Sequence, residues 1–89
     1  MKVEFLSSFE KDLRKIKDRS LLKKIEELII EIEDSQILNT IRHLEKLKGT
    51  VHNYYRIRLG QYRIGIEFVN GKVIFYRVLH RKDIYKYFP

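Results

Sequence analysis

Two tight turns, Gly60-Gln61 and Asn70-Gly71, constrain the fold of this sequence more than any other feature. Asn-Gly favours a type I′ turn, in which both central residues have positive φ, and a leading glycine favours a type II′ turn. Each turn separates runs of residues that alternate in character, which is the pattern of a β-hairpin. Residues 54–80 are therefore predicted to form a three-stranded antiparallel meander.

The turn at 60–61 fixes which residues lie opposite one another on the first two strands. It places Arg58 opposite Arg63. Because side chains alternate between the two faces of a strand, the apolar residues are predicted to share one face. These are Tyr55, Ile57, Leu59, Tyr62, Ile64, Ile66 and Phe68. The other face then carries Arg56, Arg58 and Arg63.

Three arginines on one sheet face need a physical reason, because like charges opposite one another repel. A solvated sheet face carries polar residues in any case, but converging guanidinium groups with few acids nearby favour an anion site. Residues 1–48 hold 11 Lys/Arg against 10 Asp/Glu, whereas residues 49–89 hold 8 against 2. The second half therefore carries +6 of the net charge of +7. Such a field favours polyanions, with nucleic acid the commonest and acidic protein segments the alternative.

The first half of the chain predicts a strand and two antiparallel helices. Residues 2–6 are short and alternating, as in a strand, and Ser7 with Glu10 forms a capping-box pattern at a helix start. Asp18-Arg19-Ser20 supplies a second cap. Apolar residues at helical spacing are Phe9, Leu13 and Ile16 in the first helix and Leu21, Leu22, Ile25, Leu28, Ile29 and Ile32 in the second. Residues 35–50 are expected to form a short helix or an irregular crossing.

Length and composition predict one domain, residues 1–89, with a single core. The absence of cysteine excludes disulfides, thiolate metal sites and a cysteine nucleophile. His43 and His52 have no second ligand at metal-binding spacing and are expected to be surface residues. The sequence shows no apolar signal segment and no membrane span, so we expect a soluble protein of the cytoplasm that binds no membrane.

The turn at 70–71 sets the register of the third strand of the meander. Strict alternation places Arg77 on the apolar face. It places three neighbours on the arginine face: Tyr76, Val78 and His80. Arg77 would then lie at the sheet margin and pair with a helix acid such as Glu27, because an unpaired buried charge is costly. A bulge in the strand would instead bring Arg77 and Arg81 to the arginine face. The sequence leaves both arrangements open.

The carboxyl-terminal tail, residues 80–89, alternates basic and aromatic residues. Aromatic rings stack on unpaired bases while cations hold phosphates, so this composition suits single-stranded RNA. A tail that merely covers the edge of the core is the alternative. We expect some of both, with Ile84 and Phe88 as packing residues and Tyr85 as the exposed functional ring.

These motifs resemble the RelE/ParE superfamily of small bacterial and archaeal toxins, and in particular its RelE branch. The resemblance covers nearly the whole chain and rests on three segments: Leu47-Lys48-Gly49, Tyr55-Arg56-Ile57-Arg58-Leu59-Gly60-Gln61-Tyr62-Arg63-Ile64, and Val78-Leu79-His80-Arg81-Lys82-Asp83-Ile84-Tyr85. It implies an α+β fold of the order β-α-α-β-β-β, with the amino-terminal strand and the helical hairpin packed on one face of an antiparallel sheet.

The resemblance also implies a function, that of a type II toxin and ribosome-dependent endoribonuclease. Such a toxin cleaves messenger RNA in the ribosomal A site, inhibits translation, and is held inactive by a cognate, acidic RelB-like antitoxin. Cleavage in the family proceeds by attack of the ribose 2′-hydroxyl on its own phosphodiester, so the resemblance implies no metal or cofactor. The matching site residues are Arg56, Arg58, Arg63, Arg81 and Tyr85.

One departure from the family pattern concerns proton transfer. The lysine commonly found on the first of these strands in RelE is replaced here by Arg56 and Arg58, and arginine is a poor general base. His80 is the best titratable candidate, because strict alternation places it on the arginine face. Glu67 is the second candidate, although it lies near the far end of its strand. Two alternative functions remain open: a ParE-like inhibitor of DNA gyrase and a non-catalytic RNA-binding module.

Overall fold

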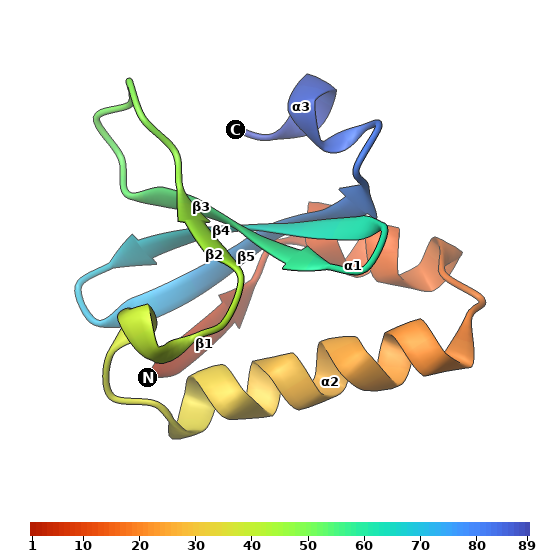
Figure 1. The fold of residues 1–89 in the computed structure, drawn as a ribbon, viewed down its shortest axis with the longest axis horizontal. Coiled ribbons are helices and arrows are strands. Elements are labelled where there is room, and N and C mark those ends of the chain that lie inside the picture. Colours follow the sequence, from red (N-terminus) through yellow and green to blue (C-terminus); the bar gives the residue numbers. More distant parts are fainter.

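Five strands form one mixed sheet in the spatial order β1-β5-β4-β3-β2. The computed structural model describes residues 1–89. Its elements are β1 (Lys2–Phe5), α1 (Ser7–Lys15), α2 (Arg19–Asp34), the 3-10 helix η1 (Leu38–Thr40), β2 (Leu44–Lys46), β3 (Tyr54–Leu59), β4 (Tyr62–Val69), β5 (Lys72–His80) and α3 (Ile84–Tyr87). The helix α2 covers one face of the sheet, and α3 lies on the other side (Figure 1). The predicted α+β class and order of the main elements are confirmed.

The predicted meander is present, and its first hairpin has the predicted register. Arg58 lies opposite Arg63, and Arg56 lies opposite Gly65. Gly60 has a φ of 60°, and Asn70 and Gly71 have φ values of 50° and 74°. These positive angles are the ones that the two turn types require. Turn chemistry alone therefore predicted the central part of the sheet.

The sheet has one strand more than predicted, and it is not purely antiparallel. β1 pairs in parallel with β5, while the other neighbours are antiparallel. β2 pairs with β3 and forms the far edge of the sheet, in the segment 35–50 that was expected to hold a short helix or an irregular crossing. A strand of three residues has too few alternating positions for a sequence pattern to reveal it.

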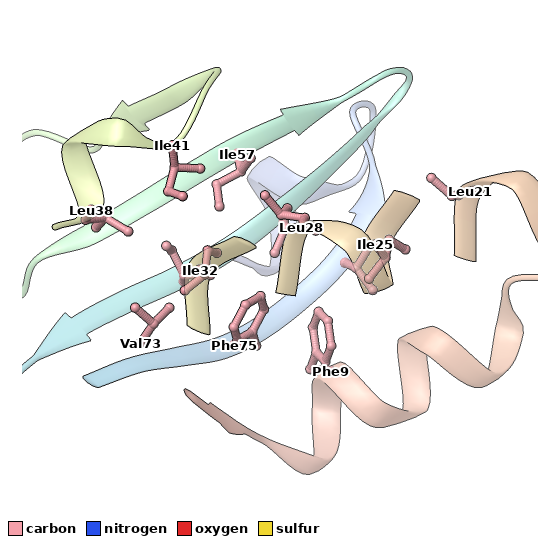
Figure 2. Close-up of a cluster of buried hydrophobic side chains, with 13 residues drawn as sticks. Phe9, Leu21, Ile25, Leu28, Ile32, Leu38, Ile41, Ile57, Val73 and Phe75 are labelled. Carbon is pink, nitrogen blue, oxygen red and sulfur yellow. The ribbon is translucent and has the colours of Figure 1, made fainter. Parts of the chain in front are cut away.

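The core lies between α2, α1 and the face of the sheet that they cover, which we call the helix face (Figure 2). The buried stripe of α2 consists of Leu21, Ile25, Leu28 and Ile32, as its spacing predicted. From α1, Phe9 packs against Phe75 of β5 with ring centroids 5.2 Å apart. Neither α2 nor any shorter helix combines the length and hydrophobicity that crossing a membrane requires.

The two predicted helix caps have different outcomes. Asp18 caps α2, because its Oδ1 accepts hydrogen bonds from the backbone N–H groups of Ser20 (2.9 Å) and Leu21 (3.2 Å). The predicted capping box of Ser7 and Glu10 is wrong, because α1 begins after Leu6 without a side-chain cap. The Leu6 N–H still donates to the Phe75 carbonyl of β5, 3.0 Å away. The sheet therefore continues up to the first residue of the helix and leaves no room for a separate cap.

Of the two arrangements that the sequence left open for β5, strict alternation and a bulge, the structure has the bulge. Ile66 lies opposite Phe75 but Gly65 lies opposite Arg77, so Tyr76 is an extra residue. The extra residue moves every later side chain of the strand to the opposite face of the sheet. Val78 is therefore buried in the core instead of facing the arginines, and His80 also leaves the arginine face.

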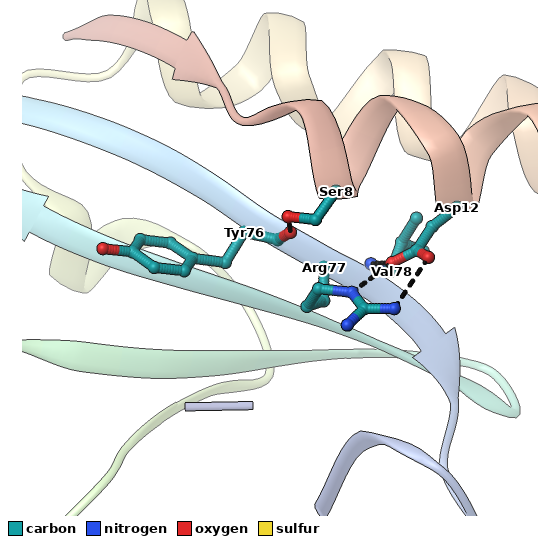
Figure 3. A network of polar contacts seen from close by, with 5 residues as sticks. All are labelled: Ser8, Asp12, Tyr76, Arg77 and Val78. Atoms are coloured by element: carbon teal, nitrogen blue, oxygen red, sulfur yellow. Dashed lines mark hydrogen bonds and ion pairs between the residues drawn. The ribbon is translucent and has the colours of Figure 1, made fainter. Parts of the chain in front are cut away.

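Arg77 pairs with a helix acid, but that acid is Asp12 of α1 and not Glu27. Its Nε and Nη2 donate to the Asp12 carboxylate over 2.8 and 3.0 Å, and the Val78 N–H donates to the same carboxylate over 3.0 Å (Figure 3). The hydrogen bond to Asp12 raises the pKa of Arg77 against the opposing effect of partial burial. Because β1 ends opposite Phe75, α1 supplies the partners that a neighbouring strand would otherwise give β5.

Candidate functional site

An open hollow of about 400 Å³ brings together four of the six predicted site residues. We call it the basic hollow, and its lining residues are His43, Leu44, Glu45, Arg56, Arg58, Arg63 and Tyr85. The three arginines come from β3 and β4, and Tyr85 comes from α3. The predicted convergence of guanidinium groups with the aromatic ring of the tail is therefore present in the fold.

Arg56 is the innermost cation of the basic hollow. Only 14% of its side chain is exposed, and its guanidinium lies 4.4 Å from the centroid of the Tyr85 ring. Its Nη2 is 3.5 Å from Oε1 of Glu45, but its buried Nε has no hydrogen-bond partner. An unpaired buried donor costs free energy that an acceptor recovers. The interior of the hollow thus favours a ligand with acceptor oxygens.

The other two arginines are held in place by groups near the hollow. Arg63 Nη1 donates to the carbonyls of Gly60 and Tyr62, each over 2.9 Å, so the hairpin turn fixes its guanidinium. Arg58 Nη2 lies 2.8 Å from Nδ1 of His43. Each guanidinium keeps further N–H groups for a ligand, because arginine has five. Fixed donors of this kind bind anions without first having to be ordered.

His43 and Glu45 line the basic hollow although no sequence pattern pointed to them. His43 was predicted to be a surface residue and is exposed, with a φ of 61°, but it also lines the basic hollow. Glu45 lies directly opposite Arg56 in the pairing of β2 with β3. Glu45 lies in β2 and His43 directly precedes it, so recognising that strand would have placed both residues beside the arginines.

The hydrogen bond from Arg58 determines how neutral His43 can act. Arginine only donates, so Nδ1 of His43 must accept, and the proton of the neutral ring then lies on Nε2. In this tautomer His43 offers an N–H donor to the hollow and no basic nitrogen. Glu45 is the one carboxylate among the lining residues, and 68% of its side chain is exposed.

His80 and Arg81 do not line the basic hollow. The β5 bulge turns His80 towards the opposite side of the sheet, where its ring packs edge-on against Tyr62 with centroids 5.7 Å apart. Its Nδ1 accepts from the Lys82 N–H over 3.2 Å. Arg81 is exposed, and its backbone N–H donates to the Gln61 carbonyl over 2.8 Å. The predicted placement of His80 on the arginine face is wrong.

The tail divides its residues between packing and exposure, as predicted. Ile84 and Phe88 are buried, whereas Tyr85 is 72% exposed. Beneath the tail, the Tyr76 hydroxyl donates to Oε1 of Glu67 over 2.6 Å. This hydrogen bond, together with burial and the carboxylate charge, raises the pKa of Tyr76 well above its ordinary value. Glu67 also contacts His52 and is committed to this network, outside the basic hollow.

Comparisons with known proteins place the sequence among toxins. A family described as ParE toxin of the type II toxin-antitoxin system parDE matches residues 3–85. The chain is 50% identical to Toxin RelE3 of Methanocaldococcus jannaschii over 90 residues, which covers all of both chains.

Solved structures extend the likeness to the fold. The toxin of a RelB-RelE antitoxin-toxin complex from Methanococcus jannaschii is 48% identical, with a TM-score of 0.83 over 97% of this chain and 99% of that one. An archaeal RelE-RelB complex from Pyrococcus horikoshii has the same fold at 20% identity, with a TM-score of 0.74 over 90% of this chain and 93% of that one. The chain therefore belongs to the RelE/ParE family of toxins of type II toxin–antitoxin systems.

Proposed function

We propose that this toxin is a ribosome-dependent endoribonuclease that cleaves messenger RNA and so inhibits translation. The observation that carries the proposal is the basic hollow, in which three guanidinium groups and an exposed aromatic ring converge. Its dimensions and charge suit one phosphodiester flanked by unpaired bases. The high identity to a RelE toxin supports the same assignment.

The chemistry that fits these groups is attack of a ribose 2′-hydroxyl on the adjacent phosphate. The oxygen bonds to phosphorus, the bond to the 5′ oxygen breaks, and a 2′,3′-cyclic phosphate and a free 5′-hydroxyl result. Negative charge grows on the phosphoryl oxygens, and the fixed donors of Arg56, Arg58 and Arg63 stabilise it. Tyr85 stacks on or orients a neighbouring nucleotide. The chemistry calls for no cofactor.

Proton transfer is assigned to Glu45 in place of His80. A base must lie within hydrogen-bond reach of the proton that it removes, and His80 lies on the other side of the sheet. Neutral His43 presents a donor, so Glu45 accepts the proton of the 2′-hydroxyl and His43 Nε2 binds a phosphoryl oxygen. The departing 5′ oxygen takes its proton from water. Arg81, exposed beside the hairpin turn, contacts the RNA backbone outside the hollow.

The expected protein partner is an acidic, RelB-like antitoxin. Two relatives of this chain were crystallised as RelB-RelE complexes. A negatively charged segment would complement the +6 charge of residues 49–89 and cover the basic hollow. Occupation of the hollow by antitoxin carboxylates would exclude the phosphodiester.

The test is cleavage of messenger RNA by purified toxin on translating ribosomes, with mapping of the new 5′ ends. Removing one fixed donor from an oxyanion-type site costs about 10²- to 10³-fold in rate, so we expect a loss of this size for Arg63→Ala. Tyr85→Ala and Glu45→Gln are also expected to lose cleavage. Lys23→Ala removes an exposed charge from α2 and serves as the matched control. All four variants should still bind the antitoxin.

The two alternative functions give different results in the same preparation. A toxin that leaves messenger RNA intact but changes plasmid topology with DNA gyrase acts as a ParE-like inhibitor. One that binds RNA without cutting it, and leaves gyrase unaffected, is a binding module. Either result overturns the nuclease proposal.

A further inference from the structure

Gly65 lies in the middle of β4, where its backbone has no need of glycine. Its φ is not in the left-handed region, unlike those of the other three glycines. A Cβ at this position would lie 2.5 Å from Cγ and Cδ2 of Phe88, which is closer than a real Cβ contact. Because Gly65 has no side chain, the Phe88 ring packs directly against the backbone of β4 at this position.

Aromatic rings form the walls around this ring. Phe88 packs edge-on against Tyr54 and Tyr76, with centroids 5.4 and 5.6 Å apart, and is only 2% exposed. Tyr76 is fixed in turn by its hydrogen bond to Glu67. We call this arrangement the Phe88 seat: Gly65 as its floor and Tyr54 and Tyr76 as its walls. It is separate from the main core cluster, which does not include Phe88.

The β5 bulge supplies two contacts to the same tail. It inserts Tyr76 next to Arg77, the residue opposite Gly65, and the Tyr76 ring contacts Phe88. It also brings Arg77 within 5.3 Å of the Tyr87 ring, and Asp12 holds that guanidinium with two hydrogen bonds. Without the bulge, strict alternation would turn Arg77 to the other face. The bulge thus orients β5 to receive the tail.

The helix that carries Tyr85 depends on such anchors. α3 has four residues, and isolated helices of this length are not stable in water. Its ends are held by buried Ile84 and Phe88, whose N–H donates to the Ile84 carbonyl over 2.9 Å. Tyr85 lies between these anchors, with its ring over Arg56. The position of the ring is therefore set by the seat and not by the helix itself.

We propose that Gly65 and Phe88 are positioning residues, which act on the site by holding the Tyr85 ring over Arg56. This inference rests on the proposed function, in which Tyr85 orients a nucleotide. A misplacement of about 1 Å at a reacting centre lowers a rate by as much as about 10²-fold. The seat therefore controls cleavage without touching the substrate.

The test measures ring position and cleavage separately in intact toxin. The chemical shifts of the Arg56 side chain, measured by NMR, report the ring current of Tyr85. The Tyr85→Ala variant gives the reference chemical shift of Arg56 without the ring. The variants are Phe88→Ala, Gly65→Ala and the two combined. Ile32→Val removes one methylene group from the main core, away from the tail, and is the control for a general loss of stability. Cleavage is followed on translating ribosomes, with kcat and KM determined for each variant.

We expect Phe88→Ala to move the Arg56 resonance to the Tyr85→Ala position and to lower kcat about 10- to 100-fold. Gly65→Ala should do the same, because its methyl group expels the ring from the seat. Once Phe88 is alanine, adding Gly65→Ala should change little further, since the methyl group then meets no ring. Ile32→Val should leave both the resonance and kcat unchanged. If Gly65→Ala does not fold, Phe88→Ala and the combined variant still provide the comparison.

Two results would overturn the inference: an Arg56 resonance that stays in place in Phe88→Ala, or a displaced resonance with undiminished cleavage. A toxin whose wild-type form cuts no messenger RNA refutes the proposed function instead. In that case the Arg56 resonance still shows whether Phe88 and Gly65 hold the Tyr85 ring in place.

Discussion

Asp12 is the buried carboxylate that joins α1 to β5. Only 3% of it is exposed, and it accepts hydrogen bonds from the Arg77 guanidinium and from the Val78 N–H. Asp12→Ala would leave both donors without their partner, and breaking such a pair typically costs 3–5 kcal/mol. Because 24% of the Arg77 side chain reaches water, we expect the free energy of unfolding to fall by about 3 kcal/mol. Urea denaturation measures this loss.

Glu10→Ala is the matched control for Asp12→Ala, because it removes an exposed carboxylate from the same helix. We expect it to change the unfolding free energy by less than about 0.5 kcal/mol. Equal losses in the two variants would mean that the pair with Arg77 is dispensable. Activity gives a second readout, since Arg77 also contacts Tyr87 of the tail: Asp12→Ala should lower cleavage less than Phe88→Ala does.

The starts of α1 and α2 provide a direct comparison between a helix with a side-chain cap and one without. Asp18 accepts two backbone hydrogen bonds at the start of α2, whereas α1 has no such cap. Replacing an N-cap residue with alanine costs about 0.5–2 kcal/mol, so we expect a loss of about 1 kcal/mol for Asp18→Ala. Ser7→Ala should cost nothing measurable. Thermal unfolding of both variants tests this. A loss of stability in Ser7→Ala would mean that Ser7 caps α1 after all.

The elements that sequence predicted are those whose cause is local. The turns at 60–61 and 70–71 need particular residues at positive φ, and the apolar stripe of α2 repeats regularly along the helix, so both can be predicted from the sequence. The bulge at Tyr76 and the short strand β2 have no such local cause. Their positions depend on Asp12, on the Phe88 ring and on pairing with β3, which are tertiary contacts.

The same distinction applies to the candidate site. Arg56, Arg58 and Arg63 were predicted to converge from the hairpin register, Tyr85 was predicted from the composition of the tail, and the family resemblance joined them in one site. His80 was misplaced because one extra residue reverses the facing of a strand, and no sequence pattern marks the bulge. His43 and Glu45 were not predicted to lie near the arginines, because the strand β2 was not predicted. Local rules thus predicted that the arginines converge, whereas only the tertiary structure shows that Glu45 and His43 lie beside them.

The charge of the protein is divided unevenly between the two halves of the chain. Residues 1–48, which include α1 and α2, are nearly neutral, whereas residues 49–89 carry +6. Binding of single-stranded nucleic acid weakens with salt with a logarithmic slope of about −0.7 for each phosphate that is neutralised. If the three arginines of the basic hollow supply the phosphate contacts, the slope for a single-stranded RNA oligonucleotide should be about −2.

Loss of one contacting arginine should then change the slope as well as the affinity. We expect Arg63→Ala to reduce the slope by about 0.7 in magnitude. Lys23→Ala removes the same formal charge from exposed α2, so it lowers the net charge equally but should leave the slope unchanged. Fluorescence anisotropy titrations over a range of salt concentrations measure both values. Equal changes in the two variants would mean that RNA responds to the overall charge of the protein, whereas a change confined to Arg63→Ala means that phosphates bind in the basic hollow itself.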